Sequence, residues 1–156
     1  MKIEKWNEKV CAMFEDASMY QHDSLHFGND ADGAYFCTDG CRAFFLPGME
    51  ILTARLYEKS NRGSVLPKIF RNASDNGKLA ETVTSGKVDG KCARRFTLGG
   101  MEVFCYEKYL RVFPKNADFY IYAPTAPILV SIWENGKANI LGIVMPFRIN
   151  GRCFSA

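Results

Sequence analysis

The first twenty residues carry apolar side chains at intervals of three and four, with Glu and Lys between them. The apolar positions are Ile3, Trp6, Val10, Met13 or Phe14, and Ala17. This spacing predicts an amphipathic helix over residues 3–20. Its charged face mixes acidic and basic residues, so it is not a basic stripe.

After His22 the apolar period changes to two, which is typical of half-buried strands. Strands are expected over residues 25–27, 34–37, 42–46 and 51–57, separated by Asn- and Gly-containing turns. The turn Thr38-Asp39-Gly40 is tight, because Gly40 adopts positive φ without steric cost. A helix followed by short strands forms the first predicted unit, over about residues 1–57.

Residues 58–91 are rich in turn-forming residues, with only short apolar pieces at 65–66 and 69–70. We expect an irregular basic connector there, with at most one short helix or strand.

The second predicted unit spans about residues 92–149. A strand over 92–98 ends at Gly99-Gly100, and Val103, Phe104, Tyr106, Leu110 and Phe113 suggest a helix over 102–113. Strands follow over 119–122, 128–133 and 138–145, with a hairpin turn at Asn135-Gly136 and an end at Pro146.

The two halves thus share a layout of one helix and three or four strands, without obvious residue identity. They predict an α+β fold in which two such units pack as one domain over residues 1–156. Strands would form one surface and the two helices the other.

Composition agrees with a globular chain, at 47% hydrophobic and 24% charged residues. We see no apolar run long enough to cross a membrane and no signal peptide, so we expect a cytoplasmic protein without membrane partners. In that reducing compartment the six cysteines are expected to be thiols.

The net charge is +3, which is too small to indicate a nucleic-acid-binding protein. The charge is uneven, because residues 1–50 carry 4 basic and 9 acidic side chains, whereas residues 55–95 carry 10 basic and 4 acidic ones. The basic segment is either a solvated surface or a face for an acidic partner, with Arg94 and Arg95 as candidate contacts.

Two stretches resemble the bacterial DNA polymerase III β subunit, the sliding clamp. Residues 35–43, Tyr-Phe-Cys-Thr-Asp-Gly-Cys-Arg-Ala, are similar to its Ala-Thr-Asp-Gly-x-Arg-Leu-Ala segment. Residues 143–149, Ile-Val-Met-Pro-Phe-Arg-Ile, are similar to its terminal Val-Val-Met-Pro-x-Arg-Leu. The resemblance covers about 45 residues at each end of the chain and implies a DNA-clamp-like fold.

In that family the two segments line a hydrophobic pocket for short peptides of polymerases and repair proteins. The resemblance implies two walls here. They are Thr38, Gly40, Arg42 and Ala43 on one side, and Val144, Met145, Pro146, Phe147 and Arg148 on the other. The alternative is that both stretches are strand ends that pack against a loop.

The chain departs from the family in its length, which suffices for one of the three domains of a clamp protomer. Six copies would be needed to encircle DNA, and the predicted helices lack the basic character of the clamp's inner surface. The sequence therefore does not support a ring, and the two walls could meet within one chain or between two.

Catalytic signatures are lacking: no phosphate-binding loop, nucleophile elbow or zinc-protease motif occurs. We expect no enzyme, no cofactor and no metal site.

Two hypotheses remain open. The first is a clamp-like module, of the kind a mobile element encodes, that binds hydrophobic peptides, with or without DNA, in replication or repair. The second is a regulatory or scaffold domain of the same fold that binds an acidic protein or nucleic acid through residues 55–95.

Overall fold

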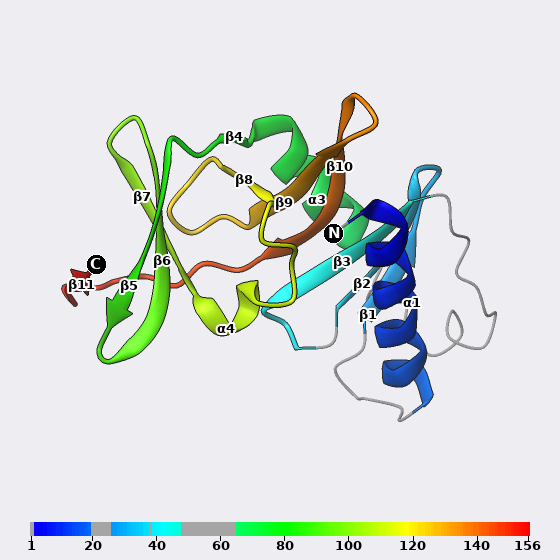
Figure 1. Ribbon diagram of the computed structural model, residues 1–156, viewed down its shortest axis with the longest axis horizontal. Coiled ribbons are helices and arrows are strands. Elements are labelled where there is room, and N and C mark those ends of the chain that lie inside the picture. The colour runs from blue at the N-terminus through cyan, green and yellow to red at the C-terminus, as the bar shows by residue number, and fades with distance from the viewer. Residues whose placement is uncertain (1, 20–25, 38, 48–64) are drawn as a thin grey trace.

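The computed structural model describes residues 2–19, 26–37, 39–47 and 65–156, which form an α+β fold with two antiparallel sheets (Figure 1). The larger sheet has seven described strands in the order β1-β2-β3-β10-β9-β8-β4. Their bounds are β1 His26–Asn29, β2 Gly33–Cys37, β3 Arg42–Pro47, β10 Lys137–Val144, β9 Ile128–Glu134, β8 Asp118–Ile121 and β4 Lys78–Leu79. The predicted α+β class is confirmed, as are the strands near 34–37, 42–46, 119–122, 128–133 and 138–145.

The central pair of this sheet joins the two ends of the sequence. β3 and β10 run antiparallel, with Ala43 opposite Ile143 and Arg42 opposite Val144. A β-bulge in β10 between Ile140 and Gly142 adds one residue to the strand. The two segments that carry the family resemblance are therefore neighbours at one end of the sheet.

Helix α1, Ile3–Met19, confirms the predicted N-terminal helix and covers one face of the large sheet. Its Trp6, Val10 and Phe14 are buried with Phe36 and Phe44 in the main core. The carboxylate of Glu134 accepts a hydrogen bond from the backbone N–H of Ile3 at 2.9 Å. A carboxylate at this position favours a helix start, because the first N–H groups lack partners within the helix.

Helix α3, Leu66–Asn76, packs on the opposite face of the same sheet. Its Phe70 ring lies 4.8 Å from that of Tyr35, and its Ala73 is fully buried. Alternate residues of β2 and β3 point to α1 and to α3, as strand geometry requires. The two helices expected together on one surface were those over residues 3–20 and 102–113. The described helices α1 and α3 instead cover opposite faces of the large sheet, because both faces of these strands are apolar.

A second sheet of four described strands lies beside the first, in the order β11-β5-β6-β7. The bounds are β11 Phe154–Ser155, β5 Thr82–Val88, β6 Lys91–Leu98 and β7 Met101–Tyr106. The C-terminal segment crosses this sheet, pairing Phe147 with Phe104 of β7 and Phe154 with Val88 of β5 (Figure 1). A Cβ on Gly86 would clash with the Phe154 ring, so glycine permits this crossing.

Two predicted segments need correction. Residues 102–113 were expected to be a helix, but they contain most of β7 and then the single turn α4, Glu107–Leu110. The helical spacing was misleading because β7 is buried on both faces, Val103 and Cys105 against the main core and Phe104 under the C-terminal segment. None of the described helices is long and apolar enough to cross a membrane.

The irregular connector was also wrong over the part that the structure describes. Residues 65–91 contain α3, β4 and all of β5 and reach the first residue of β6. Leu66, Phe70 and Ala73 have the helical spacing, and Pro67 suits a first turn. The strand expected over 51–57 lies outside the described residues.

Candidate functional site

A pocket of about 270 Å³ opens where β3 begins and β10 ends, beside α3. We call it the β3–β10 pocket. The sheet and its following loops contribute Cys37, Gly40, Arg42, Ala43, Tyr122, Pro127, Ile143 and Met145, and α3 contributes Leu66, Ile69 and Asn72. The lining is mostly apolar, with the carboxamide of Asn72 among it. The pocket lies entirely within one chain.

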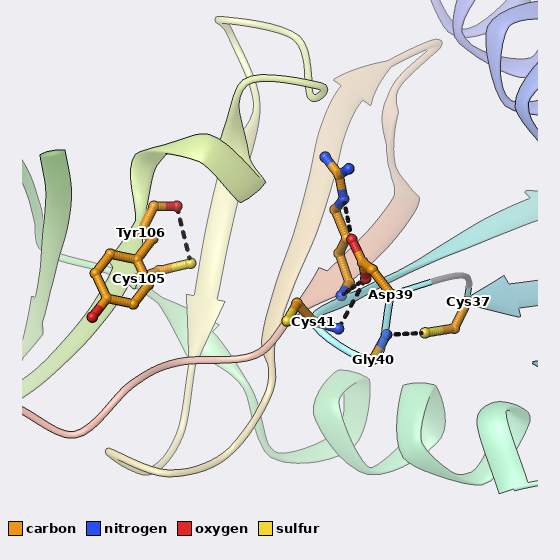
Figure 2. Close-up of polar contacts among 7 residues, drawn as sticks. Cys37, Asp39, Gly40, Cys41, Cys105 and Tyr106 are labelled. Atoms are coloured by element: carbon orange, nitrogen blue, oxygen red, sulfur yellow. Dashed lines mark hydrogen bonds and ion pairs between the residues drawn. The ribbon is translucent and has the colours of Figure 1, made fainter. Parts of the chain in front are cut away.

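The turn before β3 is held in place by hydrogen bonds to Asp39 (Figure 2). One oxygen of its carboxylate accepts the backbone N–H groups of Cys41 and Arg42 at 2.9 and 3.0 Å, and the other accepts Nε of Arg42 at 3.0 Å. Gly40 has φ of 71° and donates its N–H to Sγ of Cys37. This wall of the pocket is therefore preorganised.

The second wall is tied to the first through the backbone. The N–H of Met145 donates to the carbonyl oxygen of Cys41 at 2.7 Å, and Sγ of Cys105 donates to the carbonyl oxygen of Met145 at 3.7 Å. Met145 itself is 40% exposed, which places a flexible thioether side chain at the pocket mouth.

Four of the nine site residues suggested by the resemblance line this pocket: Gly40, Arg42, Ala43 and Met145. Thr38 lies outside the described residues. Val144 is fully buried on the α1 face, next in sequence to the pocket residue Ile143.

The other three residues of the terminal motif, Pro146, Phe147 and Arg148, do not line the pocket. The ring of Phe147 stacks on Tyr106 at 4.1 Å instead. Strand alternation explains the placement of Val144 beside Ile143, and the pairing of Phe147 with β7 carries the chain away from α3.

The candidate contacts Arg94 and Arg95 are both engaged within the fold. Arg94 forms a two-pronged ion pair with Glu107, at 2.6 and 2.8 Å. The guanidinium of Arg95 lies 5.0 Å from the centre of the Phe154 ring, and its Nε is buried without a described partner. Both arginines therefore have structural roles on the second sheet.

Sequence reasoning missed the α3 side of the pocket, namely Leu66, Ile69 and Asn72. The signal was present, because Leu66 and Ile69 are three apart, a helical interval, and Asn72 follows at the next such interval. Tyr122 and Pro127, in the connection from β8 to β9, carried no pattern that points to a pocket.

The thiols near this pocket are protonated groups in apolar surroundings. Burial raises the pKa of Cys37, and it raises that of Cys105 to about 12. All six cysteines of the chain are described, and none of them forms a disulfide. Among the described residues, no group of three or more His, Cys, Asp or Glu side chains could hold a metal ion. This chemistry suits packing and binding rather than thiolate catalysis.

No family model, curated protein or solved structure matches this chain.

Proposed function

We propose that this chain is a non-enzymatic binding module that receives an apolar side chain of a partner peptide in the β3–β10 pocket. The observation that carries the proposal is that Gly40, Arg42 and Ala43 meet Met145, 102 or more positions away, at one apolar cavity beside α3. Apolar concave sites with a few polar groups are the default binding sites of proteins.

The size of the pocket limits its occupant. At about 270 Å³ it is just below the roughly 300–1,000 Å³ of pockets for drug-sized ligands. It therefore suits one or two side chains of an extended peptide. Ile69, Ile143 and Met145 provide the contact surface for such a side chain.

Asn72 supplies polarity beside this apolar surface, because its carboxamide offers both a donor and an acceptor. It would orient the peptide backbone, while the apolar residues provide most of the affinity. The guanidinium of Arg42 pairs with Asp39 and lies 5.9 Å from the centre of the Phe44 ring, so it is directed to the α1 side of the sheet.

The resemblance to the sliding clamp suggests replication or repair proteins as partners and a clamp-like arrangement of the domain. Because the two walls meet within one chain, binding of the peptide would need neither a ring nor a second copy. A monomer is therefore sufficient for the proposed function.

Fluorescence anisotropy with two labelled peptides tests the proposal. One carries Leu-Phe between Gly-Ser flanks, and the other replaces both apolar residues by Ser. The protein should bind the first peptide and not the second. Met145→Glu and Ile69→Glu should each weaken binding about tenfold or more, because a charge would enter an apolar site.

Val83→Glu is the matched control, since Val83 is 46% exposed and lies on β5, outside the pocket lining. It should bind the Leu-Phe peptide as the unaltered protein does. Equal affinity for both peptides, or equal loss in all three variants, would show that the pocket is not the binding site.

A further inference from the structure

A second surface combines aromatic rings with positive charge on the sheet β11-β5-β6-β7. We call it the aromatic–cation surface and define it by Tyr106, Tyr109, Phe147, Lys91, Lys108 and Arg152. The rings of Tyr106 and Phe147 stack at 4.1 Å and 14°, and Tyr109 meets Tyr106 edge-on at 6.4 Å. All three rings are partly exposed.

Three cations lie over these rings. Lys91 and Lys108 each place Nζ 5.8 Å from the centre of the Tyr106 ring, and Lys108 lies 4.9 Å from that of Tyr109. The guanidinium of Arg152 lies 5.3 Å from the centre of the Phe147 ring. These cation–π contacts already restrict the motion of the lysine and arginine side chains. A ligand that binds them therefore causes a smaller further loss of side-chain entropy.

The charge on this surface is not balanced by the described carboxylates around it. Asp89 pairs with Arg152 at 3.4 Å, and Glu107 is engaged by Arg94. Lys91 and Lys108 form no ion pair with a described carboxylate, and Arg148 is exposed next to Phe147. Glu102 is the remaining exposed acid of β7, and it stands at the other end of that strand from Tyr106. The surface is therefore complementary to an anion.

We propose that the aromatic–cation surface binds single-stranded nucleic acid. Stacking platforms flanked by Lys and Arg are the shared chemistry of proteins that bind single strands without strong sequence preference. Bases would stack on Tyr109 and on the Tyr106–Phe147 pair, while Lys91, Lys108 and Arg152 neutralise adjacent phosphates. A purely acidic peptide would use the cations and leave the rings unused, so the exposed rings favour the nucleic acid.

This surface is separate from the β3–β10 pocket, because none of its six residues lines that pocket. The two proposals can therefore fail independently. The backbone still links them closely: Met145, at the pocket mouth, is two residues before Phe147. A hydrogen bond to Cys41 raises the pKa of Tyr109 and connects the turn before β3 to the same surface.

Anisotropy of labelled oligothymidine and oligouridine strands of about 15 nucleotides tests the proposal, since one binding fold covers roughly 4–16 nucleotides. Lys91→Ala and Lys108→Ala should each lower the dependence of log affinity on log salt by about 0.7, the value for one phosphate contact of a single strand. Tyr109→Ala should weaken binding by about fivefold to 100-fold, whereas Tyr109→Phe, which keeps the ring, should not.

Lys137→Ala is the matched control, because Lys137 is exposed at the first position of β10, the end of that strand remote from Met145. It should leave affinity and salt dependence unchanged. Absence of binding by the unaltered protein would overturn the proposal, as would lysine variants that behave like the control. Equal competition by polyglutamate or by duplex DNA would overturn it too, the first indicating an acidic-protein site and the second a site without stacking. Lys91 and Lys108 are exposed, so the lysine variants test the proposal even if Tyr109→Ala does not fold.

Discussion

The two faces of the large sheet are built from the same strands but are packed differently. The α1 face belongs to a cluster of twenty buried described residues that extends to Phe96, Val103 and Cys105 of the second sheet. The α3 face belongs to a cluster of nine, and it borders the β3–β10 pocket. Area removed from water is the main stabilising contribution, so most of the stability should come from the α1 face. The less extensive packing on the α3 face leaves room for a ligand.

The same truncation on the two faces gives the largest expected contrast. Leu141→Ala empties a fully buried position on the α1 face and should lower the free energy of unfolding by about 4 kcal/mol. Leu66→Ala removes a pocket-lining side chain and should cost about 2 kcal/mol, because its site already borders open space. Urea denaturation measures both values. A larger loss for Leu66→Ala than for Leu141→Ala would show that the α3 face contributes more to stability than the α1 face.

A methyl group between β3 and β10 should have a smaller effect. A Cβ on Gly142 would clash with the carbonyl oxygen of Ala43 and would lie 3.0 Å from the Phe113 ring, which stacks on Trp6. Gly142→Ala should therefore destabilise the protein by about 1–3 kcal/mol, as overpacking does. Thermal unfolding followed by circular dichroism measures this effect. An unchanged melting temperature would mean that the strands have room to separate.

High pH should weaken the α1 face through Cys105. Burial raises the pKa of this thiol from 9.0 to about 12, so the folded state retains the proton that the unfolded state releases above pH 9. Stability should therefore fall by about 1 kcal/mol between pH 9 and 10 because of this group. Comparison with Cys105→Ala isolates the contribution. The variant should lose less stability than the parent over that interval, and parallel losses would contradict the assignment.

A small gain is expected at Ser131, on the α3 side of β9. Its side chain is 1% exposed, and its hydroxyl has no described hydrogen-bond partner. Ser131→Ala removes an unpaired polar group and should raise the free energy of unfolding by up to about 1 kcal/mol. Urea denaturation decides the sign. A loss would show that the hydroxyl is satisfied in solution.

The local sequence pattern correctly predicted elements that have one polar face and turns that carry a turn-forming motif. Helix α1 has one apolar stripe, and the hairpin at Asn135-Gly136 has positive φ at both residues. It failed for β7, because Phe104 and Val103 point to opposite sides and both are buried. A fully buried strand shows no alternation, so its spacing was mistaken for that of a helix.

The candidate site was predicted in part for a similar reason. Motif resemblance indicated Gly40, Arg42, Ala43 and Met145, which all line the β3–β10 pocket. It could not indicate Ile69 or Pro127, because their contribution depends on how α3 and the β8–β9 connection pack against β10. Tertiary contacts of this kind leave no local signal in one sequence.

Methyl NMR during titration with the Leu-Phe peptide tests whether the β3–β10 pocket is the binding site. Saturable shifts are expected for the Ile69, Ile143 and Met145 methyl resonances, which lie in the pocket lining, with little change at Leu141 and Val144 on the opposite face. The Ser-substituted peptide should shift none of them. Unperturbed pocket methyls at saturating peptide, or equal shifts on both faces of the sheet, would show that the peptide does not bind in this pocket.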